Sequence, residues 1–276
     1  MSTWGSTLSC QELAAVNGVG FSPVGQAFGA AVYAAGSASG SRCPGVSASA
    51  AGVEPAGDDP GGLQPLVEAM DRARHTAVDR MIAECAALGG HGVVGVRLSS
   101  GTFSDRSEFT AIGTAVRGPG TADPPLPFTS AASGQDFARL VTTGWVPVGL
   151  ALGIAIGARH DDLTTTRQVR PWARNAEVGG WSELVNRVRR DARHRMEQDV
   201  QRLGADGVVT ADMRMRVRQR DCPVTIGRHD HIVEVAFLGT AIARFSTVGH
   251  ASPLPVMPLG ERCTDLRGDG ARLAGL

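Results

Sequence analysis

The chain repeats itself, and this internal repeat constrains its fold more than any other feature. Three blocks recur in the same order: residues 11–13 and 21–25 recur at 135–137 and 145–149, residues 88–94 at 203–209, and residues 112–115 at 238–241. The offset changes from 124 to 115 to 126, so each half carries one insertion of its own. Insertions of this kind are best tolerated in surface loops. We therefore expect two copies of one small domain, here named copy one and copy two.

Each copy is predicted to fold as strand, helix, strand, strand. The helix of copy one is indicated by apolar residues that step by three and four along residues 66–88, and Gly89 follows as a typical end. Apolar, glycine-punctuated runs indicate the strands. The predicted elements are 24–33, 66–88, 92–98 and 108–117 in copy one, and 148–158, 181–203, 207–217 and 232–244 in copy two. The fold class is therefore α+β, with two tandem β-α-β-β domains.

Composition sets the predicted domain boundaries. Residues 1–123 are expected to form the first domain, including a mobile Gly-, Ser- and Ala-rich loop at 37–62. A Pro-rich linker follows at 124–133, the second domain at 134–249, and an irregular tail at 250–276. The two halves differ in charge: residues 1–124 hold 7 Arg against 11 acidic residues, and residues 125–276 hold 20 Arg against 16.

The remaining composition excludes several function classes. The sequence has no lysine, which excludes lysine Schiff bases and phosphate-loop lysines. Neither a signal peptide nor an apolar run long enough to span a membrane is evident. Five scattered cysteines, without a CxxC pair, favour a reduced, cytoplasmic setting. We expect no membrane partner.

One block of copy one resembles a known family. The residues are Ala73-Arg74, Arg80-Met81, Glu84, Leu88-Gly89, the run 93–97, and Glu108 with 113–116; copy two repeats a weaker form in 203–209 and 237–243. This pattern resembles the YbjQ-like family, whose domain is also named for heavy-metal binding. The resemblance implies a dodecin-like β-α-β-β domain and ring-shaped homo-oligomers, typically pentamers. Its motifs are structural glycines and apolar runs, so they support the fold more firmly than the function.

A metal site has only weak candidates in the sequence. His229 and His231 would share one face of a strand, and Cys222 lies seven residues before the first of them. A metal site needs three or four convergent ligands, and copy one has no counterpart of this group. We therefore interpret these residues as polar loop residues and expect no cofactor. Cys85 lies on the apolar stripe of its helix and is interpreted as a buried hydrophobic residue.

The strongest charge pattern is an alternation of arginines in copy two, at Arg214, Arg216, Arg218 and Arg220. On a strand, these side chains share one face, with a mostly apolar set on the other. The face is either solvated or paired with the acidic copy one of the same assembly. The alternative is an anion-binding surface for nucleic acid or an acidic protein. We favour an assembly role, because few aromatic residues are available nearby to stack on bases.

These features favour a non-enzymatic, self-assembling protein. Within this sequence we find no nucleophile–base pair and no cofactor fingerprint. A small β-α-β-β unit leaves strand edges that a neighbouring subunit can pair, so the principal partner is expected to be the chain itself. The two copies would either alternate within rings or join different rings, and closing symmetry in the second case makes a hollow cage. The competing hypothesis is a metal- or anion-binding module or sensor.

Overall fold

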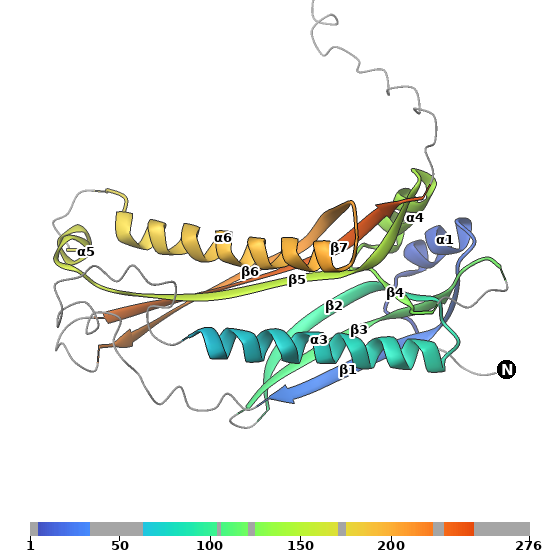
Figure 1. The fold of residues 1–276 in the computed structure, drawn as a ribbon, viewed down its shortest axis with the longest axis horizontal. Coiled ribbons are helices and arrows are strands. Elements are labelled where there is room, and N and C mark those ends of the chain that lie inside the picture. Colours follow the sequence, from blue (N-terminus) through green and yellow to red (C-terminus); the bar gives the residue numbers. More distant parts are fainter. Residues whose placement is uncertain are drawn as a thin grey trace, which may run out of the picture. The chain divides into compact units, whose positions relative to one another are not determined.

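The computed structural model describes residues 5–33, 63–103, 106–120, 125–170, 175–222 and 229–245 (Figure 1). The loop expected at 37–62 and the tail expected at 250–276 lie outside the described residues. Residues up to Phe245 belong to one compact unit, so the two copies pack together. The boundary between them therefore stays a prediction from the sequence.

Both copies have the predicted β-α-β-β order, and each is preceded by a short helix. Copy one consists of α1 (Cys10–Gly18), β1 (Ser22–Tyr33), α3 (Gln64–Ala87), β2 (Gly92–Phe103) and β3 (Arg106–Arg117). Copy two consists of α4 (Gly134–Thr142), β5 (Trp145–His160), α5 (Leu163–Gln168), α6 (Gly179–Arg202), β6 (Gly207–Asp221) and β7 (His229–Arg244). Between them lies β4 (Phe128–Thr129). The α+β fold class is confirmed, and the strands are longer than predicted.

The strand pairing repeats between the copies. In copy one the sheet order is β1-β3-β2-β4, and in copy two it is β5-β7-β6, with the long strands antiparallel. The first strand of each copy has a register shift at the same place, between Pro23 and Gly25 and between Pro147 and Gly149. A shared irregularity at equivalent positions is what a duplicated domain would keep.

A glycine in the first strand of each copy lets the long helix approach closely. A β-carbon on Gly29 would overlap the carbonyl oxygen of Ala77, and one on Gly153 would overlap that of Ala192. Both strands pass directly under a helix backbone at these points, as expected where a strand glycine marks close backbone approach. Gly29 and Gly153 are equivalent in the repeat, at the offset of 124, and they mark a close approach of helix and sheet in each copy.

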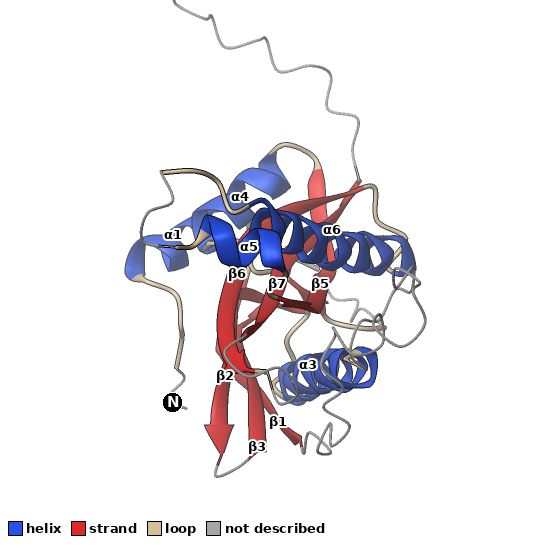
Figure 2. Ribbon diagram, turned by 90° about the vertical axis from the view of Figure 1, so that its left-hand side faces the viewer, coloured by secondary structure: helices blue, strands red, loops and turns tan. Residues whose placement is uncertain are grey.

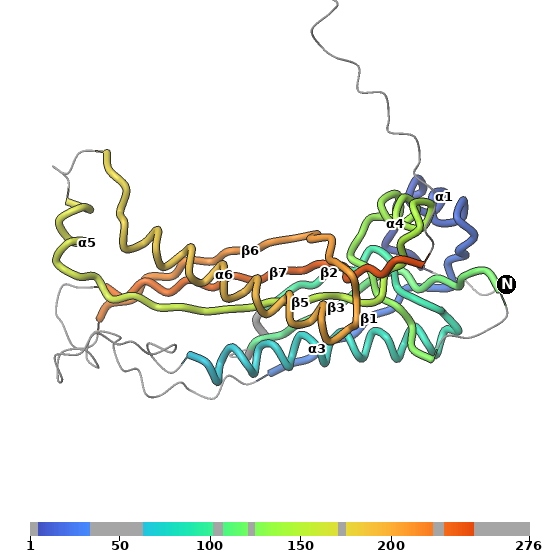
Figure 3. The backbone as a smooth tube through the Cα atoms, turned by 45° about the horizontal axis from the view of Figure 1, so that its top comes forward, coloured from blue at the N-terminus to red at the C-terminus, as the bar shows by residue number. Residues whose placement is uncertain are grey.

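The short helices α1 and α4 were not predicted, although the sequence carries their signals. Ser9 and Glu12 form a reciprocal capping box at the start of α1. Ser133 accepts a hydrogen bond from the backbone nitrogen of Asp136 at the start of α4. Glu12 and Asp136 belong to the block of the repeat at 11–13 and 135–137, and Ser9 and Ser133 are related by the same offset of 124. Figures 1 and 3 show the two helices side by side, and they are in contact.

The segment predicted as a linker contributes a strand to copy one. Phe128 and Thr129 of β4 pair in parallel with Gly92 and Val93 of β2. Phe128 also packs in an aromatic cluster: its ring centroid lies 5.9 Å from that of Phe21 and 5.8 Å from that of Phe137. The segment between the copies therefore completes the sheet edge of copy one.

The two faces of the copy-two sheet are covered by different helices. The core of copy two lies between this sheet and α6, and includes Ala151, Ala155, Val233 and Val235. On β5, Leu150 and Leu152 point to the opposite face from Ala151. They belong to the core of copy one around α3. Figure 2 shows α6 and α3 on different sides of β5, β6 and β7. None of the helices among the described residues combines the length and hydropathy needed to cross a membrane.

Candidate functional site

A buried arginine joins the two copies. Arg74 on α3 is only 6% exposed, and its guanidinium donates hydrogen bonds to the carbonyl oxygens of Gly153 (3.2 Å) and Phe237 (3.1 Å). Burial lowers the pKa of Arg74 to about 10, and the nearby Asp71 carboxylate opposes this shift. The side chain is therefore still charged at neutral pH, and it ties the helix of copy one to two strands of copy two.

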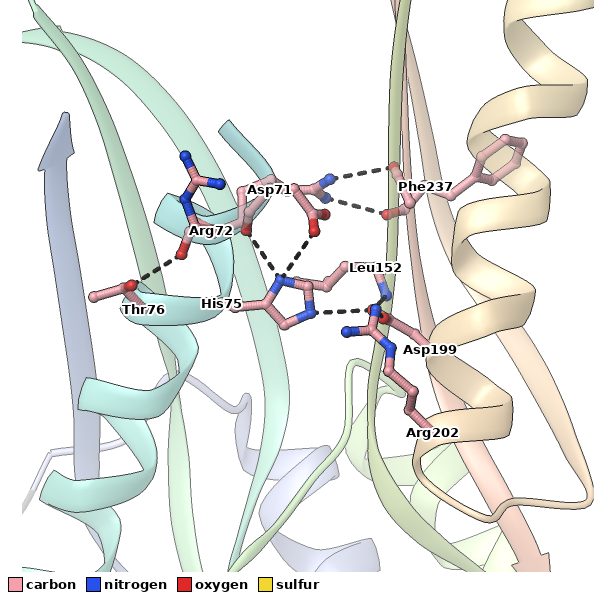
Figure 4. A network of polar contacts seen from close by, with 10 residues as sticks. Asp71, Arg72, His75, Thr76, Leu152, Asp199, Arg202 and Phe237 are labelled. Atoms are coloured by element: carbon pink, nitrogen blue, oxygen red, sulfur yellow. Dashed lines mark hydrogen bonds and ion pairs between the residues drawn. The ribbon is translucent and has the colours of Figure 1, made fainter. Parts of the chain in front are cut away.

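A buried carboxylate lies at the same junction (Figure 4). Asp199 on α6 accepts a hydrogen bond of 2.9 Å from the backbone nitrogen of Leu152, and Arg202 also pairs with it. His75 on α3 reaches across the junction, with its Nε2 atom 3.1 Å from the Asp199 carboxylate and its Nδ1 atom 3.0 Å from the carbonyl oxygen of Asp71. The network connects α3, β5 and α6, so it fixes how the copies pack.

The four arginines of β6 lie on one strand face, as predicted, but their acidic partners are close by in copy two. Arg220 lies 3.1 Å from Asp230, and Arg216 and Arg218 each lie 4.0 Å from Glu234, with both carboxylates on β7. The fourth, Arg214, pairs with Asp212 of its own strand at 2.8 Å. Among the described residues, this face contacts copy one through a hydrogen bond from Arg216 to the hydroxyl of Ser100 (3.0 Å).

Within the chain, the carboxylates closest to these arginines thus lie on the neighbouring strand and on β6 itself. Strand pairing explains this: Arg216 is opposite Glu234, and Arg220 is opposite Asp230, in the β6–β7 register. Directly opposed charges of unlike sign stabilise a sheet modestly. Whether the arginine face also contacts another subunit stays a prediction.

The other face of β6 is apolar and exposed. Met213, Met215 and Val217 are 47%, 50% and 55% exposed, although their partners on β7 belong to the core under α6. Among the described strands, β6 has a neighbour on one side only. A long edge strand with an exposed apolar face is a template for pairing with another chain.

The structure does not bring the three predicted metal candidates together. His231 contacts Asp161 at 3.3 Å and packs on the ring of Trp181, whereas His229 pairs with Asp221 at 3.0 Å. Each histidine has a carboxylate partner of its own, and neither belongs to the group of ligand atoms that includes Cys222.

Cys222 instead lies in another cluster, with His160 and Asp230, and one ligand atom of each lies within 4.8 Å of the others. Sulfur, imidazole and carboxylate ligands in this combination suit zinc. However, Asp230 also pairs with His160 at 2.9 Å and with Arg220 at 3.1 Å, so its charge is already compensated. From the sequence, His160 was interpreted as an isolated histidine; its position opposite Asp230 in the β5–β7 register is what places it here.

Cys85 is fully buried, as predicted for a small hydrophobic residue. Burial raises the pKa of its thiol to about 11, and a backbone hydrogen bond at Gly92 only partly opposes this shift. The thiolate is the nucleophilic form of cysteine, so this side chain is unreactive at neutral pH.

Comparison with protein families matches both copies. The YbjQ family model, described as "Putative heavy-metal-binding", matches residues 59–118 and 149–244. The first stretch covers α3, β2 and β3, and the second covers β5, α5, α6, β6 and β7. The same family pattern thus applies to the two halves that the internal repeat relates.

Three similar proteins bear on the assignment. The chain is 33% identical over 265 residues to the encapsulin nanocompartment protein Rv1762c of Mycobacterium tuberculosis, and this match covers 92% of the chain and 91% of that protein. UPF0145 proteins of Halorubrum lacusprofundi and Helicobacter hepaticus are 47% and 40% identical over 58 residues. These shorter matches cover 21% of the chain and 56% of each relative.

Proposed function

Because the chain belongs to the YbjQ family, with a family domain in each copy, we propose that it is a non-enzymatic protein that assembles with itself into a shell. The observation that carries this proposal is the 33% identity to an encapsulin nanocompartment protein over 92% of the chain. That match extends across both copies and the segment between them. A relative that matches this chain over nearly its whole length supports the same function for this chain.

The geometry supports self-assembly independently of the relatives. The edge of β6 is open among the described strands, and its exposed apolar residues lie beside it. On copy one, Phe28 and Val32 of β1 are 44% and 52% exposed. Large apolar side chains on open strands of both copies favour burial against further subunits. We propose ring-shaped homo-oligomers, with pentameric rings as the resemblance implies, that close into a hollow cage.

The experiment is a size measurement of the purified full-length chain, followed by electron microscopy of any large species. We expect particles many times heavier than the 28.6 kDa chain, with a hollow interior. A monomer at micromolar concentration in light scattering would refute the proposal. Solid or open-ended assemblies would leave self-assembly standing but refute the closed cage.

The arginine face of β6 is proposed to help fix how subunits associate. The side chains of Arg216 and Arg218 are 45% and 68% exposed, and they share the single carboxylate of Glu234, so positive charge remains available to a neighbour. The double variant Arg216→Glu and Arg218→Glu should alter the assembly and leave the domains folded. Arg167→Glu, an exposed arginine on α5, is the matched control. Unchanged assembly of the double variant across salt concentrations, with loss of binding to nucleic acid, would assign the arginines to a ligand.

A metal-binding module is the second candidate function. The observation that favours it is the group of Cys222, His160 and Asp230 at the end of the copy-two sheet. The compensating ion pair between Asp230 and Arg220 counts against it, because a bound cation would have to compete with the guanidinium. We therefore rank it below assembly; elemental analysis distinguishes the two.

A further inference from the structure

We propose that the open edge of β6, together with the groove between β6 and α4, binds the N-terminal segment and helix α1 of a second copy of this chain. The second chain would repeat on copy two the contacts that β4 and α4 make on copy one within a single chain. This inference rests on the proposed self-assembly and specifies its interface. The internal repeat provides the template, because it relates each contacting residue to an equivalent one.

The template is a short parallel ladder within one chain. The backbone nitrogen of Phe128 donates to the carbonyl oxygen of His91 (3.1 Å), and that of Ser130 donates to Val93 (2.8 Å). In return, the backbone nitrogen of Val96 donates to the carbonyl oxygen of Ser130 (2.9 Å). Three hydrogen bonds thus attach the start of copy two to the outer edge of β2.

Each residue of this ladder has an equivalent residue, either in copy two or near the N-terminus. At the offset of 115, His91, Val93 and Val96 correspond to Asp206, Val208 and Ala211, at the start of β6. The offset of 124 makes Ser6 the counterpart of Ser130. The counterpart of Phe128 is Trp4, which lies outside the described residues. Among the described strands, none pairs with this side of β6.

Exposure differs between equivalent positions of the two copies. Val94 in copy one is fully buried, in a cluster with Phe128 and Phe137 of the segment that docks there. Its counterpart Val209 is 40% exposed. Beside it lies an open groove of about 490 Å³, whose lining includes Ala132 and Leu140 of the α4 segment and Val209 and Ala211 of β6. Leu13 of α1 is the counterpart of Phe137 and would enter this groove.

The contacts of Arg74 and His75 with copy two provide a second, independent template for the proposed contact between chains. Its counterparts on α6 are Arg189 for Arg74 and Arg190 for His75. Both are exposed, and neither has a hydrogen-bond or ion-pair partner among the described residues. Asp199, the partner of His75, corresponds to the exposed Glu84 of copy one. The contact between chains that corresponds to His75–Asp199 is therefore an ion pair between Arg190 of one chain and Glu84 of the next chain.

The surface that α6 would cover is exposed and apolar. Leu152 on β5 is 2% exposed because α3 packs against it, whereas its counterpart Phe28 on β1 is 44% exposed. Two residues of α3 that pack on copy two, Val78 and Ile82, have charged counterparts in Arg193 and Glu197. The contact between chains is thus more polar than the one within a chain, and should weaken as salt is raised.

The consequence is a head-to-tail arrangement. Copy one of each chain provides the inserted segment, copy two provides the groove, and the same relation repeats around the assembly. Repetition of a heterologous contact closes into a ring when its rotation divides the circle. The net negative charge of residues 1–124 and the net positive charge of residues 125–276 favour this pairing of unlike halves.

A disulfide trap tests the strand pairing directly. Val93 and Thr129 are Cα partners in the template, and their counterparts are Val208 and Gly5. In the full-length variant Gly5→Cys with Val208→Cys, oxidation should join different chains into a covalent ladder on a non-reducing gel. Each single-cysteine variant controls for the native cysteines. The absence of cross-linking in a sample that light scattering shows to be assembled would overturn this interface but leave self-assembly intact; a monomeric parent would refute both.

A charge exchange tests the helix contact. Arg190→Glu should raise the concentration for half-assembly by about tenfold, which corresponds to about 1.4 kcal/mol, and Glu84→Arg in the same chain should restore it. Arg167→Glu is the control. Circular dichroism checks that each variant is folded, since Glu84 also accepts a hydrogen bond from the backbone nitrogen of Phe28 (2.6 Å). Unchanged assembly of Arg190→Glu, or no rescue by the second substitution, would contradict the proposed pair.

Discussion

Replacement of Arg74 by methionine should loosen the junction between the two copies. The substitution keeps a long apolar side chain on α3 but removes the guanidinium that donates to Gly153 and Phe237. Both acceptors are main-chain carbonyl groups of copy two, so the effect should be seen in how the copies unfold together. We expect lower stability and weaker cooperativity between the copies.

The magnitude follows from two opposing terms. Hydrogen bonds from a charged donor contribute about 1.5–3 kcal/mol each, so the two bonds of Arg74 contribute about 3–6 kcal/mol. Burial lowers its pKa from the usual value of an arginine to about 10, which corresponds to a cost of about 3 kcal/mol for keeping the charge inside. The balance predicts that Arg74→Met loses about 2 kcal/mol of unfolding free energy.

Urea unfolding followed by tryptophan fluorescence measures this loss, at a concentration and salt where the parent is not assembled. The matched control is Arg189→Met, the same change at the equivalent position of α6, where the side chain is exposed. We expect the control to change the unfolding free energy by less than about 0.5 kcal/mol. If Arg74→Met unfolds like the parent, or if the control loses as much, the junction does not depend on the buried arginine.

Three further predictions concern other parts of the structure. Stability should fall between pH 9 and pH 11, because the pKa of Cys85 is about 11 in the folded state against an ordinary thiol value of 9.0, so the unfolded state loses its proton first. Thermal unfolding of Cys85→Val should lack this loss of stability. An identical pH profile for the variant and the parent would contradict the prediction. Gly153→Ala should destabilise copy two by several kcal/mol in urea unfolding, because its β-carbon would overlap the backbone of α6 at Ala192; a change below about 1 kcal/mol would mean that the helix shifts freely. Elemental analysis of untagged protein should find no stoichiometric transition metal, whereas one zinc per chain that disappears in Cys222→Ala or His160→Ala would move the metal-binding hypothesis to first place.

The sequence was sufficient to predict the duplicated fold. Periodic apolar residues and matched glycines located both long helices and all six long strands, because each is a property of a contiguous segment. The burial of Cys85 followed from its place on the apolar stripe of α3. The short helices α1 and α4 were missed, although the Ser9 and Ser133 caps were visible in the sequence.

What the sequence could not predict was contact between segments far apart along the chain. The partners of Arg74 depend on how copy two packs against α3, which no local pattern records. Likewise, the cluster of Cys222 with His160 depends on the β5–β7 register. The arginine strand was recognised, but its carboxylate partners on β7 are set by strand pairing, which no local pattern records.

The strand donated by the segment between the copies has a consequence for the kinetics of association. Since β4 follows copy one on the same polypeptide, its pairing with β2 is an intramolecular event, with an effective concentration on the order of millimolar for a short tether. This junction therefore forms at the same rate however dilute the protein is. The rate at which the equivalent junction at β6 forms would depend on protein concentration. Joining two copies in one polypeptide thus halves the number of bimolecular association steps that assembly requires.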